Sequence, residues 1–197
     1  MKKLLFSAAI LLTSASAFAQ HAIGSFNIQP KVGVNIASLT DADGADSRIG
    51  LVIGAEGEYQ ISQKFSVTAG LLYSQQGAKD SGYDDGYKVD ATVKLDYINI
   101  PILANLYVAP GLAIKAGIQP GFNINSKIKM EGNGVSLTTD LEETKTLDFS
   151  IPIGLSYEYA NIQLDARYNW GLTKVNDMLD KSKNSVFQFT VGYKFNL

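Results

Sequence analysis

The 197-residue sequence contains no cysteine, and no segment after the first twenty residues approaches the roughly 18 consecutive apolar residues that a spanning helix needs. The first absence excludes a fold held together by disulfides. The second excludes a helical membrane protein. If the chain resides in a membrane, it must therefore form a closed β-barrel, because helices and closed barrels are the two structures that satisfy every backbone polar group in lipid.

The chain also lacks an excess of charge of either sign, and it has a single histidine, His21. Without a basic patch, no nucleic-acid partner is expected. Without cysteine, and with His21 near the start of the chain, a serine or threonine nucleophile would need a lysine or carboxylate as its base. A membrane-embedded hydrolase therefore stays open as a minor alternative, and we expect a protein that is not an enzyme, with no cofactor and no metal.

The first residues, MKKLLFSAAILLTSASAFAQ, have the features of a secretory signal peptide. Two lysines precede an apolar run, and small residues end in Ala17-Phe18-Ala19, so cleavage is expected before Gln20. A membrane anchor is disfavoured because the run is too short. The expected organisation is a signal peptide over residues 1–19 and one domain over residues 20–197, with 15 basic and 19 acidic residues in the mature chain.

The rest of the chain alternates apolar and polar residues with a period of two, which indicates strands. In SVFQFTVGYKFNL, for example, Phe187, Phe189 and Val191 alternate with Gln188 and Thr190. Eight such segments are predicted, near residues 26–37, 48–59, 65–76, 96–107, 112–122, 148–158, 162–171 and 185–197. Pro101 and Pro152 fall inside two of them, and bulges are expected there because proline cannot donate to a ladder.

The connections between these segments alternate between short and long. Short turns are expected at ISQK, APG and YAN, whereas long polar loops are expected over residues 40–47, 78–92, 126–145 and 173–184. Short and long connections then lie at opposite ends, as in an up-and-down barrel of the outer membrane. The large rings sort in the same way into two groups. One is expected at the short-turn end (Tyr59, Phe65, Tyr107, Tyr157, Tyr159, Tyr193, Phe195) and one at the long-loop end (Tyr73, Tyr97, Phe122, Phe149, Tyr168, Trp170, Phe187).

The polar faces of the strands carry charges of both signs and most of the glycines. A water-soluble barrel such as a lipocalin would turn these charges outward, but it would have to bury about ten rings in an interior that is only just wide enough for side chains. We therefore expect the apolar face to meet lipid and the charges to pair inside the barrel. The predicted lumen charge network comprises Arg48, Glu56, Glu58, Lys115, Asp148, Glu158, Asp165, Arg167 and Lys194.

Two acidic segments invite a binding interpretation. TDADGAD brings together Asp41, Asp43 and Asp46, but the glycine comes too early for a calcium loop and no glutamate follows, so an exposed loop is favoured. SGYDDGYKVD, over residues 81–90, contains two tyrosines and could contact a partner, although a solvated loop is the default expectation.

Four segments resemble the PorT-like outer-membrane β-barrel family. They are KVGVNIASL, VTAGLLYSQQG, LDYINIPILANLY and LDARYNWGLTKV, and the third carries a Tyr-x-x-x-Pro pattern that includes Pro101. The resemblance covers nearly the whole mature chain and implies a small barrel in a Gram-negative outer membrane. Most members of this family have no assigned activity, and one branch belongs to a protein secretion apparatus.

Taken together, the sequence predicts an all-β protein, an eight-stranded antiparallel up-and-down transmembrane β-barrel in the outer membrane. The expected role is structural, or binding through the outer loops, and the alternative is a membrane anchor in a secretion or transport assembly. The expected partners are the lipid bilayer, the outer-membrane insertion machinery and an unidentified protein. The final strand resembles the C-terminal signal that this machinery reads, with Tyr193, Phe195 and Leu197 as its candidate residues.

Overall fold

The computed structural model describes residues 22–40, 46–84, 87–132, 135–141, 144–176 and 182–197, and the predicted signal peptide and His21 lie outside these ranges. The strands are β1 (Phe26–Leu39), β2 (Asp46–Ser62), β3 (Phe65–Asp84), β4 (Tyr87–Asn99), β5 (Ile102–Ala109), β6 (Leu112–Gly132), β7 (Val135–Asp140), β8 (Leu147–Tyr159), β9 (Ile162–Lys174), β10 (Lys183–Tyr193) and β11 (Phe195–Asn196). Among these residues there is no helix long and apolar enough to span a membrane.

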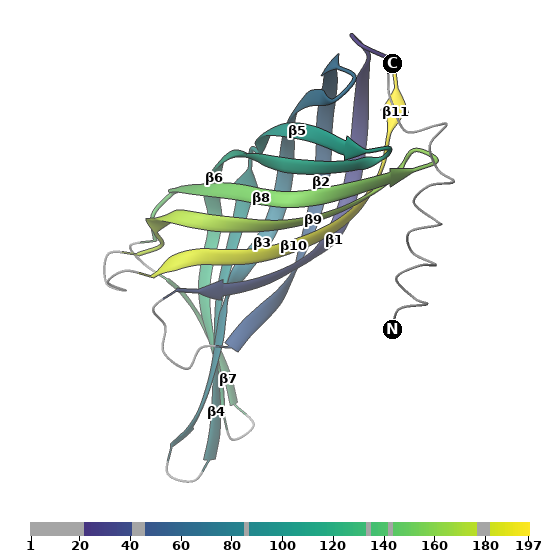
Figure 1. Cartoon of the computed structure of the whole chain (residues 1–197). Coiled ribbons are helices and arrows are strands. Elements are labelled where there is room, and N and C mark those ends of the chain that lie inside the picture. The colour runs from purple at the N-terminus through teal and green to yellow at the C-terminus, as the bar shows by residue number, and fades with distance from the viewer. Residues whose placement is uncertain (1–21, 41–45, 85–86, 133–134, 142–143, 177–181) are drawn as a thin grey trace, which may run out of the picture.

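The strands close into an antiparallel ring of eight (Figure 1). Around the ring the order is β1, β2, β3, β4, β6, β8, β9 and β10, and β10 pairs with β1 to close it. β4 and β5 are two halves of one ring strand, because both pair with β3 on one side and β6 on the other, and β11 continues β10 along β1. The predicted eight-stranded up-and-down barrel is therefore confirmed.

Successive side chains along each ring strand face the inside and the outside of the barrel in turn. Along β1, Asn27, Gln29 and Lys31 are buried, whereas Ile28 and Val32 are exposed. The same alternation of polar-in and apolar-out runs along β8, β9 and β10. The predicted orientation of the two faces is therefore correct, and the apolar side chains form the outer wall.

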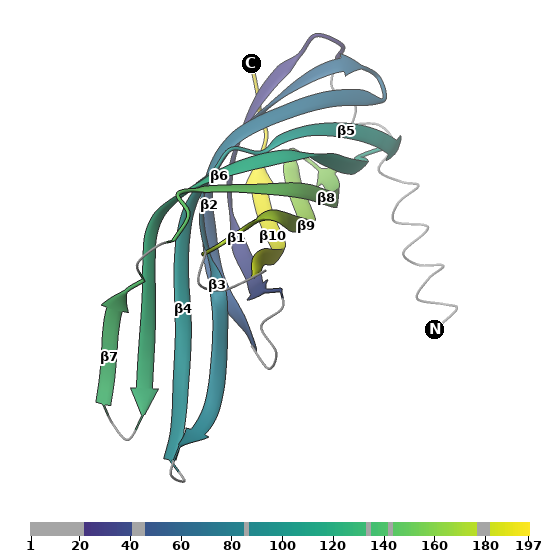
Figure 2. The same cartoon turned by 90° about the vertical axis from the view of Figure 1, so that its left-hand side faces the viewer.

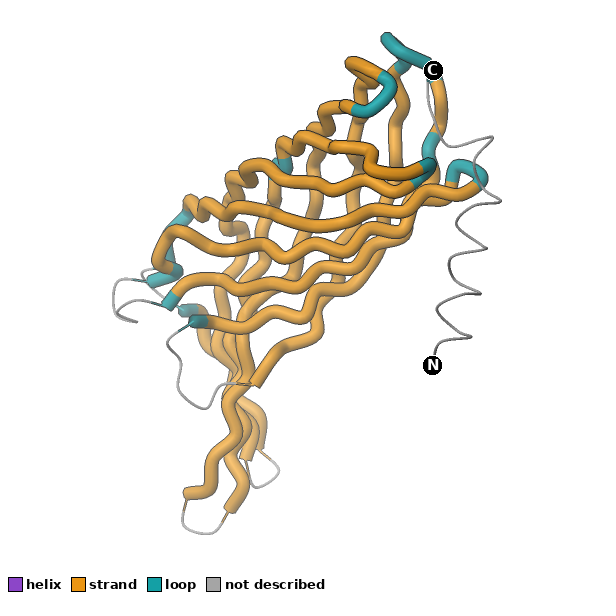
Figure 3. The backbone as a smooth tube through the Cα atoms, viewed as in Figure 1, coloured by secondary structure: helices purple, strands orange, loops and turns teal. Residues whose placement is uncertain are grey.

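Short turns join the strands at the end of the barrel that also holds the C-terminus (Figure 3). β8 and β9 are joined by Ala160 and Asn161, both with positive φ (48° and 66°), the conformation that a two-residue hairpin turn needs. β5 and β6 are joined at Pro110 and Gly111, and Gly111 also has positive φ. The predicted short turns are all present.

At the opposite end, two of the predicted long loops are strands. β3 and β4 continue as a hairpin to Asp84 and Tyr87, and β6 turns back as β7. Together β3, β4, β6 and β7 form a four-stranded sheet, called the extension here, which projects beyond the ring (Figures 1 and 2). The prediction of loops is therefore wrong for residues 78–84, 87–92, 126–132 and 135–140. These strands lie beyond the lipid-facing band, so they lack the run of large apolar residues that marked the other strands.

Pro101 and Pro152 do not form bulges, in contrast to the prediction. Pairing of β3 keeps the same register on both sides of Pro101, from Leu72 opposite Asn99 to Ala69 opposite Ile102. Pro152 lies opposite Asn169 in a continuous β8–β9 ladder. Each proline therefore removes one ladder donor without shifting the strand, and neighbouring bonds such as that from Gly70 N to Pro101 O (3.0 Å) hold the register.

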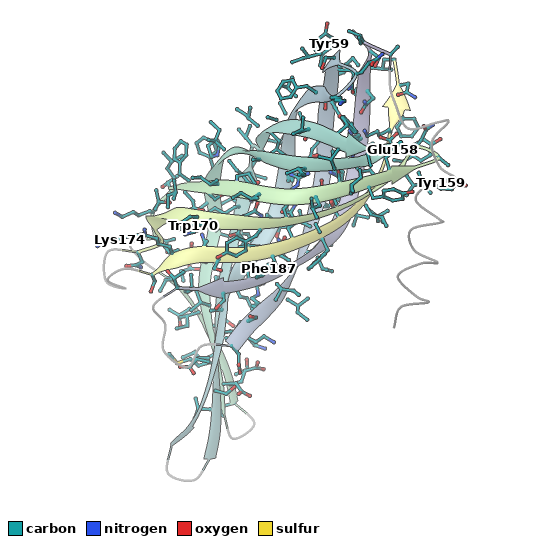
Figure 4. All side chains as sticks on the ribbon, in the orientation of Figure 1. Tyr59, Glu158, Tyr159, Trp170, Lys174 and Phe187 are labelled. Atoms are coloured by element: carbon teal, nitrogen blue, oxygen red, sulfur yellow. The ribbon has the colours of Figure 1, made fainter. Side chains whose placement is uncertain are left out.

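Four aromatic residues lie at the predicted ends, and two others do not lie at a lipid interface. Tyr59 and Tyr159 lie near the short turns, and Trp170 and Phe187 lie toward the other end of the barrel (Figure 4). Tyr97 and Tyr107, however, are buried inside the ring rather than placed at a lipid interface. Both belong to the polar-face positions of β4 and β5, where the phenol hydroxyl finds partners.

Candidate functional site

The lumen near the short turns holds an ion cluster centred on Lys194. Its Nζ lies 2.8 Å from Glu58 Oε2 and 2.6 Å from Glu158 Oε2. The other oxygen of Glu58 accepts hydrogen bonds from Ser66 Oγ at 2.5 Å and from Tyr107 OH at 2.6 Å. All five side chains are buried. This end of the lumen is therefore filled by one connected polar network.

A second cluster occupies the middle of the lumen and is centred on Arg167. Its Nε donates to Asp165 Oδ1 at 2.6 Å, and its Nη2 lies 2.6 Å from Glu56 Oε1. Lys31 Nζ lies 2.8 Å from Glu56 Oε2 and 3.3 Å from Asp165 Oδ2. Lys115 Nζ lies 2.8 Å from Asp165 Oδ2. Five charged side chains from β1, β2, β6 and β9 are thus held in mutual contact across the barrel.

The charges of the two clusters balance. Four basic groups (Lys31, Lys115, Arg167, Lys194) face four acidic groups (Glu56, Glu58, Glu158, Asp165). Buried charges are tolerated when each has partners of opposite sign and hydrogen bonds for its remaining atoms. The clusters neutralise and fill the lumen, and every charge in them is engaged with another part of the barrel wall.

The structure brings seven of the nine predicted lumen residues into these clusters, and it places Arg48 and Asp148 elsewhere. Arg48 donates to the backbone oxygen of Gln76, and Asp148 accepts hydrogen bonds from Thr173 and Asn184. Lys31 belongs to the central cluster but was not among the predicted residues. Its position on the polar face of β1, two residues from Gln29, was a signal that could have placed it there.

Toward the extension the interior changes from polar to apolar. Leu39, Ala78, Leu95, Tyr97 and Val175 form a buried cluster, called the mouth cluster here, with Val93 and Leu141 packed against it. The sequence does not reveal this cluster, because its members come from segments predicted as loops or from the ends of strands. It covers the long-loop end of the lumen with packed side chains.

One face of the extension continues the mouth cluster. Pairing places Ala91 opposite Met130 and Met130 opposite Leu137, and the next row toward the tip joins Val89, Gly132 and Val135. Val135 is 70% exposed and Leu137 is 61% exposed. On β4, β6 and β7 this inner face therefore runs as an apolar surface from the mouth cluster to exposed aliphatic side chains near the tip, whereas β3 contributes Asp80 opposite Ala91.

The other face of the extension is polar. Lys129 and Glu131 form an ion pair of 2.6 Å, and Ser81 donates to Asp90 at 2.7 Å. The extension is thus an amphipathic sheet outside the ring. In the described residues, no group of three or more acidic or histidine side chains is arranged to hold a metal ion, and Asp41 and Asp43 lie outside those residues.

The outer wall carries an apolar groove of about 500 Å³ over β1, β8, β9 and β10. Leu155, Leu164 and Phe189 line it with exposed side chains, and Ala166 leaves room between them. A groove of this composition on a lipid-facing wall suits an acyl chain, so it belongs to the membrane contact of the barrel rather than to a separate site.

The three residues of the predicted C-terminal signal follow the ring strand on its outer face. The rings of Tyr193 and Phe195 lie 4.8 Å apart, and Phe195 pairs with Ile28 of β1. Leu197 N donates to Phe26 O at 3.0 Å. The aromatic residues are exposed on the outer wall, next to the seam at which the barrel closes.

Comparison with known proteins agrees with this architecture. Solved structures that resemble the chain include Ail, the attachment invasion locus protein of Yersinia pestis, with a TM-score of 0.51 and 15% identity over 88% of this chain and 100% of that one. Neisserial surface protein A (NspA) has a TM-score of 0.52 and 16% identity over 86% of this chain and 97% of that one. At such identities the likeness shows the fold alone.

Ail has also been solved in complex with the heparin analogue sucrose octasulfate, and that structure has a TM-score of 0.50 and 14% identity over 88% of this chain and 100% of that one. A comparison with curated protein sequences gave no match. The sequence profile of the family described as outer membrane protein beta-barrel domain matches residues 18–177, which is most of the chain. The chain therefore belongs to the outer membrane protein beta-barrel domain family.

Proposed function

We propose that this outer-membrane barrel is a binding protein without enzymatic activity, and that it binds through the extension. The observation that carries the proposal is the contrast between the two parts of the molecule. The lumen is filled by engaged charges and closed by the mouth cluster, whereas the extension presents exposed aliphatic side chains such as Val135 and Leu137. Exposed apolar patches rimmed by polar residues are typical of interaction sites.

In this proposal the extension lies on the extracellular side. Short turns at the opposite end and longer connections here are the usual arrangement of outer-membrane barrels. The signal peptide over residues 1–19 would deliver the chain to the periplasm with cleavage before Gln20. Fractionation of cells should then recover the protein in the outer membrane, released by detergent and with heat-modifiable migration on gels. Recovery as a soluble periplasmic protein would contradict the proposal.

A shortened variant tests whether the extension is the binding part. Removing residues 81–90 and 129–138, and closing each hairpin with Asn-Gly, trims paired rungs without changing the register of the ring. The variant should insert and keep heat-modifiable migration, but it should lose the proteins that crosslink to the intact chain on cells. If the same proteins crosslink to the shortened variant with equal yield, the extension is not the binding part.

The second candidate function is a membrane anchor in a secretion or transport assembly. The resemblance of residues 95–107 and 164–175 to the PorT-like family supports it, and the extension could serve as the attachment point. Native gels of gently solubilised membranes separate the two candidates. An anchor migrates in a stable large complex, whereas a surface binding protein migrates alone until its ligand is added.

Hydrolysis is the least favoured role. Among the described residues, the closest pairs of a serine or threonine hydroxyl and a carboxylate are Ser66 with Glu58 and Thr173 with Asp148. Both carboxylates are buried, and Glu58 is already held by Lys194. A nucleophile needs a path for its substrate and a base that is free to take its proton. Neither pair offers these, which favours binding over catalysis.

A further inference from the structure

β7 forms an open edge of the extension. Among the described strands it pairs with β6 and with no other, and all six of its residues are exposed. Leu141 N donates to Ser126 O at 3.0 Å, just beyond the end of β7. Since backbone groups alternate sides along a strand, residues 135, 137 and 139 also face β6. The N–H and C=O groups of Ser136, Thr138 and Asp140 therefore point away from the sheet.

This edge lacks the features that usually protect a sheet from further pairing. Natural edge strands are commonly shielded by lysine, proline, a bulge or a covering segment. Val135–Asp140 contains neither lysine nor proline, and its ladder with β6 runs without a register shift. Among the described residues no other strand pairs with this edge, and Asp140 is its one charged side chain over six residues, which is a typical strand length.

The side chains of β7 define what could pair with it. Val135 and Leu137 lie on the apolar inner face, next to Met130 on β6. Ser136 and Thr138 lie on the polar face, and Asp140 pairs across the ladder with Lys127. The nearest further charges, Lys129 and Glu131, form an ion pair with each other. An added strand would therefore meet aliphatic groups on one face, and two hydroxyl groups and the carboxylate of Asp140 on the other.

A second copy of this chain in the same membrane does not fit the edge. The two copies would be related by a two-fold axis along the membrane normal, so both extensions would point outward. Their β7 strands would then run parallel. In the joined sheet, the apolar face of one extension and the polar face of the other would lie on the same side. Antiparallel pairing, which matches the rest of the barrel, is not available in that arrangement.

A copy in an opposing membrane could pair antiparallel, but only tip to tip. Six residues give a contact about 20 Å long and one strand wide. Stable protein complexes bury roughly 800 Å² on each partner. An extended segment of another protein has no such limit, because beyond β7 it can continue over the apolar inner face, past Met130 and Ala91 toward the mouth cluster.

We propose that β7 receives an extended segment of a partner protein as an additional antiparallel strand, with aliphatic side chains at alternate positions and uncharged polar side chains between them. The proposal rests on the binding function proposed above and specifies its chemistry. Backbone hydrogen bonds to Ser136, Thr138 and Asp140 supply affinity, and the aliphatic contacts with Val135 and Leu137 supply specificity, as in other cases of strand addition.

A substitution at Thr138 separates the open edge from the rest of the sheet. Thr138→Pro removes an outward N–H but no bond to β6, and proline is tolerated on edge strands. Thr138→Val is the matched control, because it changes the side chain and keeps the N–H. The probe is a labelled synthetic peptide in which threonine and valine alternate, with a lysine at each end, and a scrambled peptide of the same composition serves as its control.

Binding of the peptide to the refolded barrel in detergent micelles is measured by fluorescence anisotropy. Thr138→Pro should weaken it at least about tenfold, since it interrupts the ladder at its centre, whereas Thr138→Val should change it less than about threefold. In the intact chain, hydrogen exchange at the Ser136 and Thr138 amides should slow when the peptide binds. Equal binding by the proline variant, equal binding of the scrambled peptide, or unchanged exchange at these amides each overturns the proposal.

The shortened variant distinguishes this failure from a failure of the proposed function. If cell-surface partners are lost in the shortened variant but crosslink normally to Thr138→Pro, the extension binds by another surface and strand addition is wrong. If the partners crosslink equally to the shortened variant, the binding function itself is wrong. If the partners are lost in both variants and kept in Thr138→Val, strand addition is supported in cells.

Discussion

Replacing Arg167 by methionine is the most direct test of the closed lumen. The guanidinium donates to Asp165 at 2.6 and 2.9 Å and lies 2.6 Å from Glu56. Methionine fills most of the same volume without charge, so both carboxylates lose their shared partner inside the barrel. They keep Lys31 and Lys115, whose ammonium groups lie 2.8 Å from Glu56 and Asp165 respectively.

These contacts determine how much the substitution should lower the free energy of unfolding. Removing one member of a buried ion pair typically costs 3–5 kcal/mol, because an unpaired charge is left in a dry site. Here each carboxylate retains a lysine, so Arg167→Met should lower the free energy of unfolding by about 3 kcal/mol, at the lower end of that range. Lys115→Met should cost less, about 1–2 kcal/mol, because Asp165 keeps its two-fold contact with Arg167.

The measurement is denaturant unfolding of the barrel in lipid vesicles, followed by the fluorescence of Trp170 and by heat-modifiable migration. Trp170 is the single tryptophan and lies exposed on the outer wall, so its emission reports transfer between lipid and water. The double variant Glu56→Gln/Arg167→Met restores the charge balance and should recover part of the loss. A cost below about 1 kcal/mol for Arg167→Met would mean that water screens the central cluster and that the lumen is not closed. A larger cost for Lys115→Met than for Arg167→Met would mean that Lys115 is the main partner of Asp165.

Three further predictions concern the wall, the lumen and the C-terminus. Leu164→Arg, at an exposed site on the outer wall, should cost about 2–4 kcal/mol in lipid vesicles, whereas Leu164→Met should be nearly neutral; a harmless arginine would mean that this face does not meet lipid. The purified protein should show no steady conductance in planar bilayers, since side chains fill an eight-stranded ring; a large stable current would require a wider barrel or an oligomer. Deleting residues 195–197 should block insertion in cells but permit refolding in detergent, because Phe195 and Leu197 are proposed to be read by the insertion machinery; normal insertion contradicts this, and failure in both settings means that strand closure alone explains the loss.

The ring could be predicted from the sequence because its signal is local. Each strand that crosses the wall alternates faces with period two, and this period directly reports which side chain points inward. Ile53 and Leu164 on the outside and Glu56 and Lys115 on the inside follow from that rule alone. Which charges meet across the lumen depends instead on register and shear, so the isolation of Arg48 and Asp148 from the clusters could not be read from the chain.

The extension escaped prediction because its strands obey a different rule. A strand outside the lipid band does not need an apolar face unless another part of the protein covers that face. The polar residues 81–90 therefore resemble a loop in the sequence, although they belong to a β-hairpin. The predicted bulges at the prolines were also wrong. A missing donor at Pro101 or Pro152 was expected to force a bulge, but the flanking ladder bonds are numerous enough to hold the register through a single gap.

The continuity of β3, β4 and β6 from the wall to the extension also has a mechanical meaning. Hydrogen bonds in a sheet lie perpendicular to its strands. A pull on the extension along its length therefore loads many ladder bonds in shear at the same time, and it passes directly into strands that belong to the ring. A sideways pull on β7 instead opens its ladder with β6 one pair at a time, from Val135 opposite Gly132 onward. The extension should therefore resist force along its length, whereas β7 should be the first strand to separate under a sideways force.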